Sequence, residues 1–180
     1  LMYDPTRHGS LNREIGRWGL ARVETTGPGA GGVVVHRLTQ EIIKSRLSDP
    51  QQAQRRTEIQ SVLADADRGN PDEPANWPTY EALRPHLEAT GASNSEQPAV
   101  RQLLIDMTRY LWARGDYTSC VELANAVLNE WLALFGEDDT WVLRLRYPLA
   151  LALRDAGRED EAYAMNRDSL ERLRRTLGSD

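Results

Sequence analysis

The sequence has little of the residue types that mark metal sites and disulfide scaffolds. It contains one cysteine, Cys120, among 180 residues. This excludes an internal disulfide framework and a cysteine-rich metal site, and it fits a reducing compartment. The three histidines, His8, His36 and His86, are scattered, and none has a second histidine four residues away as in helical zinc sites. We therefore expect no resident metal ion and no cofactor.

Long apolar runs and a strong excess of one charge are also missing. No segment approaches the roughly 20 apolar residues that span a bilayer, and the start lacks the pattern of a secretion signal. The 27 acidic and 22 basic residues give a net charge of −5, which argues against a general nucleic-acid binder. We expect a cytoplasmic protein without a membrane segment. Because the chain begins at Leu1 with what looks like the end of a domain, we also expect a fragment of a longer protein.

The strongest pattern present is a gap-free internal repeat of 42 residues in the C-terminal half. It pairs Leu111 with Leu153, Gly115 with Gly157, Cys120 with Ala162, Leu128 with Leu170, and Gly136 with Gly178. Repeated helix pairs stack on one another because one pair cannot bury its own apolar face, and the stack offers an extended binding surface. This pattern favours a binding protein over an enzyme.

Apolar residues at helical spacing predict four helices in this half. The first begins near Ala99 and ends at Gly115, and the second runs from Tyr117 to Phe135. Asp139 is the expected N-cap of the third helix. Pro148 lies within this helix, and a break there would shift Arg144 and Tyr147 relative to Arg154. The fourth runs from residue 159 to residue 177, with acidic residues at its positive end.

The N-terminal part predicts a helix, a β-hairpin and a second helix. The helices are expected at 10–19 and 38–47, and the strands at 21–26 and 33–37, on either side of a glycine-rich loop. That loop, 27–32, matches the dinucleotide motif G-x-G-x-x-G, but a strand of valines follows it where a helix would be required. The connector 50–97 predicts a polar helix over 50–66, a helix with Pro78 in its first turn, and a kink or early end near Pro85.

The segment Ala113-Arg114-Gly115-Asp116-Tyr117, with Cys120, Leu128 and the tail at 134–140, resembles tetratricopeptide repeats of the kinesin-light-chain type. The resemblance covers residues 99–180. It implies an α-solenoid in which small residues occupy the helix-packing positions Thr108, Ala150, Cys120 and Ala162.

The segment Val35-His36-Arg37-Leu38 resembles the Met-His-Asp motif in the winged helix of NB-ARC-type signalling nucleoside triphosphatases. The resemblance implies that His36 senses a nucleotide phosphate in an intact protein. Arg37 replaces the acidic residue of the motif, and the chain has no phosphate-binding loop. With the connector at 74–78 and the segment 109–117, the order of parts resembles the tetratricopeptide-repeat proteins of FxSxx-COOH peptide-maturation systems, which implies a regulatory or scaffold role.

These patterns predict a mainly α chain in three parts. Residues 1–49 would be the C-terminal part of a winged-helix domain with its β-hairpin, 50–97 a helical connector, and 98–180 two tetratricopeptide-type repeats. The first helices of the two repeats would line a groove for a protein or peptide. The groove residues expected are Gln102, Ile105, Arg109, Trp112, Arg144, Tyr147, Leu151 and Arg154.

Three arginines and two aromatic residues in one groove suit an acidic or carboxylate-terminated peptide. The alternative is that the arginines form a solvated face and that Trp112 packs against a neighbouring helix. We expect a scaffold or sensor module of a nucleotide-dependent regulatory protein, and no catalytic residues. A second hypothesis is a transcriptional regulator whose winged helix contacts DNA through Arg13, Arg17 and Trp18 while the repeats bind a signal peptide. The local excess of positive charge is small for a DNA-reading domain.

Overall fold

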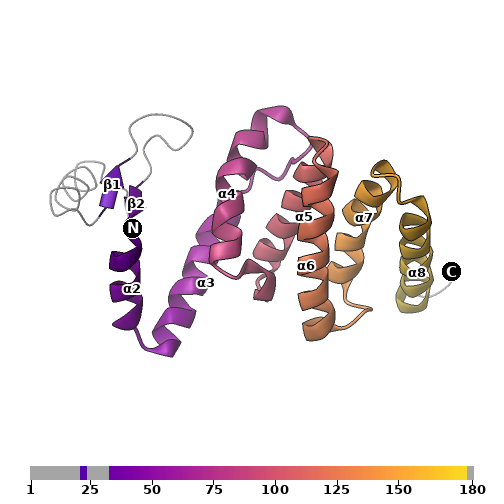
Figure 1. Cartoon of the computed structure of the whole chain (residues 1–180). Coiled ribbons are helices and arrows are strands. Elements are labelled where there is room, and N and C mark those ends of the chain that lie inside the picture. Colours follow the sequence, from indigo (N-terminus) through magenta and orange to yellow (C-terminus); the bar gives the residue numbers. More distant parts are fainter. Residues whose placement is uncertain (1–20, 24–32, 178–180) are drawn as a thin grey trace. The chain divides into compact units, whose positions relative to one another are not determined.

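The computed structural model describes residues 21–23 and 33–177 (Figure 1). Helices account for most of the described residues, and no helix among them is long and apolar enough to cross a membrane. The chain divides into two compact units, Leu1–Arg56 and Thr57–Asp180. The helix expected at 10–19 and the glycine-rich loop at 27–32 lie outside the described residues.

The first unit contains a short antiparallel hairpin followed by a helix. Strand β1 (Ala21–Val23) pairs with β2 (Val33–Val35), and Ala21 lies opposite Val35. The second strand is shorter than the expected 33–37, and residues 24–26 of the first expected strand lie outside the described residues. Helix α2 (Arg37–Ser45) follows the single residue His36, which is exposed. The sequence therefore located the strand-to-helix junction correctly.

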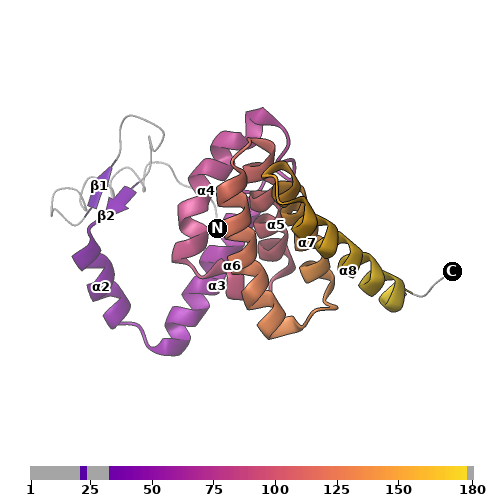
Figure 2. The same cartoon turned by 45° about the vertical axis from the view of Figure 1, so that its right-hand side comes forward.

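The second unit is helical in its described part. Helix α3 (Asp49–Asp65) begins before this unit and ends within it, and α4 (Trp77–Ala89), α5 (Pro98–Ala113), α6 (Tyr117–Phe135), α7 (Thr140–Asp155) and α8 (Glu159–Leu177) follow. Short 3₁₀ turns, η1 (Pro74–Asn76) and η2 (Ala92–Asn94), flank α4. Figures 1 and 2 show α5 to α8 in chain order, each beside its predecessor, and α5 also packs against α7. Helices α5, α6 and α8 begin and end within two residues of their predicted bounds, and α7 begins directly after its expected N-cap, Asp139.

The two helix turns that the 42-residue repeat relates are alike. Gly115 and Gly157 have φ angles of 82° and 79°, a conformation that favours glycine. Each glycine N–H donates to the carbonyl three residues earlier, at 2.9 and 3.0 Å. In each turn the next N–H donates to the carbonyl five residues earlier, at 2.9 and 2.8 Å. We call α5 with α6 the first hairpin and α7 with α8 the second.

Small residues lie where the helices of each hairpin meet. Thr108, Cys120, Ala150 and Ala162 are all buried. The Cys120 thiol contacts the Thr108 carbonyl oxygen at 3.2 Å, so the first hairpin is packed closely at this point. Burial raises the pKa of Cys120 to about 12, which keeps the thiol protonated and unreactive at neutral pH.

The early helix end expected near Pro85 was wrong, and Pro148 does not break the third helix. Helix α4 continues through Pro85 to Ala89, and α7 continues through Pro148 to Asp155. A proline inside a helix removes one backbone hydrogen bond. In α7 the neighbouring turns bear the buried side chains Leu145 and Leu149, so packing against other helices holds the element together. The groove residues before and after Pro148 therefore lie on one continuous helix.

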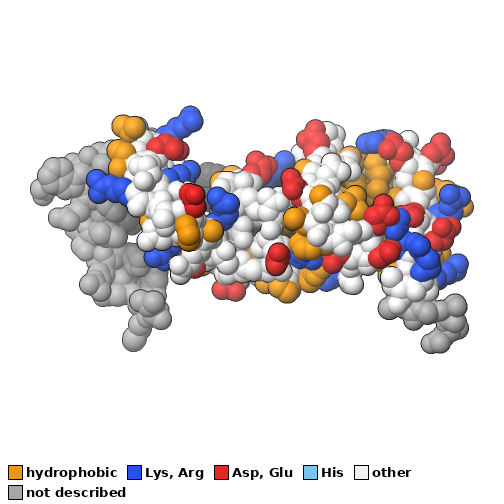
Figure 3. Space-filling view, turned by 90° about the horizontal axis from the view of Figure 1, so that it is seen from below, with side chains coloured by type: hydrophobic (Ala, Val, Ile, Leu, Met, Phe, Trp, Pro, Cys, Tyr) orange, Lys and Arg blue, Asp and Glu red, His pale blue; other side chains and the backbone are white. Residues whose placement is uncertain are grey.

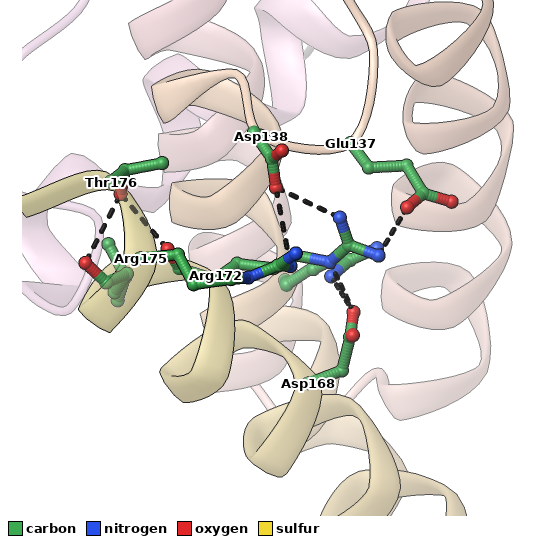
Figure 4. A network of polar contacts seen from close by, with 8 residues as sticks. Glu137, Asp138, Asp168, Arg172, Arg175 and Thr176 are labelled. Carbon is green, nitrogen blue, oxygen red and sulfur yellow. Dashed lines mark hydrogen bonds and ion pairs between the residues drawn. The ribbon is translucent and has the colours of Figure 1, made fainter.

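A network of charges fastens α8 to the loop between α6 and α7 (Figure 4). Arg172 donates from Nη1 to Asp138 at 2.9 Å, from Nε to Asp168 at 2.8 Å, and from Nη2 to Glu137. Arg146 of α7 also donates to Asp168, at 2.5 Å. These bonds raise the pKa of Arg172, with Asp168 as the largest cause. Arg172 therefore ties α8 to the loop, and Asp168 ties α8 to α7 through Arg146.

Candidate functional site

The predicted groove residues lie on neighbouring helices, and two of them touch across the repeat. Arg144 of α7 donates from Nη2 to the Oε1 atom of Gln102 on α5. The two residues are 42 positions apart, so they occupy equivalent places in the two hairpins. We call the surface formed by Gln102, Arg109, Trp112, Arg144, Tyr147, Leu151 and Arg154 the α5–α7 face.

Arg144 is exposed, and its guanidinium lies over the ring of Trp141, 4.5 Å from the ring centroid. Among the described residues it has no carboxylate partner. One helical turn further on, Tyr147 is also exposed. Arg144 and Tyr147 together therefore offer a cation and an aromatic ring to solvent.

Trp112 and Arg154 point to the same carboxylate. Trp112 donates from Nε1 to Oδ2 of Asp155, and Arg154 donates from Nε to Oδ1, both at 2.8 Å. The bond from Arg154, and then the bond from Trp112, lower the pKa of Asp155. Trp112 is half-buried and packs against the core as well. The expected approach of these two residues is thus found, with a carboxylate between them.

Arg109 is already paired within the molecule. Its Nε and Nη2 atoms donate to the two carboxylate oxygens of Asp72, at 2.8 and 2.5 Å. This bidentate bond raises the pKa of Arg109. Asp72 comes from the loop before η1, so the connector supplies part of this surface.

Ile105 and Leu151 contribute less exposed surface to the predicted groove than expected. Ile105 is buried in the core, and so the expectation that it lines an exposed groove was wrong. Helix α5 packs against α4, α6, α7 and η2, so side chains all around it are buried, including those of Leu104, Asp106 and Thr108. Leu151 is half-buried.

A buried carboxyl group lies close to this surface. Asp106 of α5 accepts a hydrogen bond from Nε2 of Gln102 at 2.9 Å. Burial, with the nearby carboxyl of Asp67, raises the pKa of Asp106 to about 6, although the bond from Gln102 acts in the opposite direction. Tyr80 donates to Asp67 at 2.7 Å. Gln102 therefore links the exposed Arg144 to a carboxyl that changes its charge near pH 6.

Sequence patterns missed the acidic partners of the arginines. Asp155 could have been suspected, since it follows Arg154 directly on the last turn of α7. Asp72 belongs to a loop without periodicity, and no local pattern places a loop against a helix 37 residues away. The contact between Arg144 and Trp141 could have been predicted, because Trp141 lies three residues before Arg144 on the same helix.

Charges of both signs are interspersed on the α4–α8 region. On the described part of the Thr57–Asp180 unit that Figure 3 shows, red and blue side chains alternate with small apolar areas. Within the described ranges, no group of three or more His, Cys, Asp or Glu side chains is placed to hold a metal ion.

His36, the residue expected to sense a nucleotide, precedes α2 and is exposed. Its side chain makes no cap hydrogen bond to that helix. The residues expected to contact DNA, Arg13, Arg17 and Trp18, lie outside the described residues.

No family model, curated protein or solved structure matches the chain. The function must be inferred from the α5–α7 face itself.

Proposed function

We propose that this chain is a protein- or peptide-binding module whose α5–α7 face holds an acidic or carboxylate-terminated segment of a partner. In this proposal residues 98–180 are two tetratricopeptide-type repeats, and the surface is the concave side of a helical solenoid. The two like glycine turns and the contact between Gln102 and Arg144, 42 residues apart, support a repeated unit.

One observation carries the choice of partner. Arg144 is the arginine of the α5–α7 face that has no carboxylate partner among the described residues, and Tyr147 is exposed beside it. A guanidinium held over an aromatic ring is pre-oriented, so it can take a carboxylate with little loss of side-chain entropy. Arg109 and Arg154 are already paired with Asp72 and Asp155, so they stabilise the surface and contribute less to partner binding.

In an intact protein the N-terminal part would belong to a winged-helix domain next to a nucleotide-dependent switch. The hairpin β1–β2, the junction at His36 and helix α2 support this arrangement. Partner binding to the repeats would then shift the equilibrium of the switch. The proposed activity is binding, and no catalytic step is part of it.

A peptide titration tests the proposal. We expect an acidic peptide with a free C-terminal carboxylate to bind the native chain, and the Arg144→Ala variant to bind it about tenfold more weakly, the loss of one charge-assisted contact. Arg144→Lys should fall between the two, because lysine keeps the charge but loses the planar stacking on Trp141.

The matched control is Arg167→Ala, which removes an exposed arginine from α8, away from the α5–α7 face. It should bind the peptide as the native chain does. Equal binding by the native chain and by an Arg144→Ala, Arg154→Ala double variant would exclude this surface as the site.

A further inference from the structure

A second candidate site lies on another face of the first hairpin. Helices α4, α5 and α6 and the turn η2 enclose a pocket of about 300 Å³, which we call the α4–α6 pocket. Leu87, Leu104, Met107 and Val127 are buried side chains in its lining. On α5, Met107 lies about 160° around the helix axis from Arg109, since each residue turns the helix by about 100°. The pocket is therefore separate from the α5–α7 face.

The rim of this pocket is acidic. Glu88 of α4 and Glu122 of α6 line it, both are exposed, and neither makes an ion pair with a described residue. Arg84, the basic residue at the rim, faces Asp116 at 4.0 Å. Among the described residues, these two carboxylates thus form no ion pair beside an apolar hollow.

The second hairpin allows a comparison of the pocket lining within the same chain. Its equivalent hollow, of about 340 Å³, has Arg146 where the α4–α6 pocket has Leu104, and Asp168 where that pocket has Ala126. Arg146 and Asp168 form an ion pair at 2.5 Å. Arg158 and Glu161, also in that lining, pair at 2.7 Å. The charges there are satisfied internally, so an apolar floor with unpaired carboxylates is a property of the first hairpin alone.

We propose that the α4–α6 pocket binds an apolar side chain of a partner protein that is flanked by lysine or arginine. A volume of about 300 Å³ is at the low end for small-molecule sites, and it accommodates one aromatic or branched aliphatic side chain. The apolar group gains free energy from leaving water, and the flanking cation meets Glu88 and Glu122. This preference is opposite in charge to the one proposed for the α5–α7 face, and it does not depend on that proposal.

Three blocked peptides test the site on the full chain. The probe has one phenylalanine between two lysines, and its controls replace the phenylalanine with alanine or both lysines with glutamate. We expect the probe to shift the backbone amide signals of Leu104, Met107 and Leu123 in NMR spectra, and each control peptide to bind at least tenfold more weakly.

Two variants locate the binding. Glu88→Gln with Glu122→Gln removes the rim charges, and Ala126→Arg places a cation four residues after Glu122, where the two can pair. Both changes are at exposed positions and should leave the circular dichroism spectrum unchanged. Each should weaken binding of the probe about tenfold, whereas Glu130→Gln, an exposed control substitution on α6, should leave binding unchanged.

The proposal is overturned by any of three results. These are no binding of the probe at millimolar concentration, equal binding of the phenylalanine and alanine peptides, or equal binding by the native chain and the rim variants.

Discussion

The two hairpins have the same backbone plan but differ in what covers them. Val121, Leu128 and Trp131 of α6 are 9%, 7% and 0% exposed. Their equivalents 42 residues later on α8, Tyr163, Leu170 and Leu173, are 69%, 49% and 38% exposed. Helix α7 packs against α6, and no described helix takes that place on α8. The repeat therefore fixes the turn and the helix pair, while the neighbouring helices decide which residues form the core.

The largest expected effect contrasts two equivalent positions. Trp131→Ala should lower the free energy of unfolding by about 3–5 kcal/mol, because the ring is fully buried and its Nε1 donates to the Ser93 carbonyl at 2.9 Å. Leu173→Ala should cost less than about 1 kcal/mol, since that side chain is already partly in water. Urea unfolding of both variants measures the difference, and similar losses would contradict the comparison.

The ion pair of the second hairpin can be replaced by the residues of the first. Arg146→Leu alone should lower stability by about 1–2 kcal/mol, because Asp168 loses one of its two arginine partners. Arg146→Leu with Asp168→Ala copies Leu104 and Ala126, and should return the stability to within about 1 kcal/mol of the native value. A double variant less stable than both single variants would show that the hairpins are not interchangeable here.

Asp106 gives the first hairpin a pH dependence, because its equivalent in the second hairpin is Pro148. The pKa of Asp106 in the folded chain is raised to about 6, above the unfolded value near 4, so its protonated form is favoured by folding. Its contribution to stability is present at pH 4 and is lost as the pH rises through 6.

Asp106→Asn removes this dependence. The variant should match the native chain near pH 4 and be about 1–2 kcal/mol more stable than the native chain at pH 7. Thermal unfolding of the variant and the native chain at pH 4 and pH 7 measures this difference in stability. A stability difference that does not change with pH would show that Asp106 titrates as an ordinary carboxyl.

The smallest effect tests the equivalence of the turns. Gly115→Ala and Gly157→Ala should each cost about 1 kcal/mol, because both force a side chain into a left-handed backbone conformation and neither added methyl meets another atom. Losses that differ by more than the experimental error would mean that the two turns are held differently.

The sequence predicted the helices of the Thr57–Asp180 unit because each carries its own signals. Asp139, for example, caps α7 by accepting from the N–H groups of Trp141 and Val142 at 2.9 and 3.1 Å. The small packing positions were implied by the resemblance to a repeat family, whereas the mainly helical class and the turn glycines followed from such local patterns. The proline effects did not, because tertiary packing overrides a single lost hydrogen bond.

The candidate site was predictable only in part. Helical spacing predicted that Gln102, Arg144, Trp112 and Arg154 share one surface. The contact of Gln102 with Arg144, and the shared carboxylate of Trp112 and Arg154, are findings of the structure. The partner of Arg109 was not predictable, since Asp72 reaches it from a loop whose path no periodicity describes. The exposed rim of the α4–α6 pocket depends in the same way on how three helices meet.

The central claim is that the α5–α7 face binds an acidic segment, and the indole N–H signals of the tryptophans test it most directly. On titration with an acidic, carboxylate-terminated peptide, the signals of Trp112 and Trp141 should move together, because one lies on this surface and the other lies under Arg144. The signal of Trp131, buried against Ser93, should stay in place. Saturable binding that leaves Trp112 and Trp141 unmoved would contradict the account.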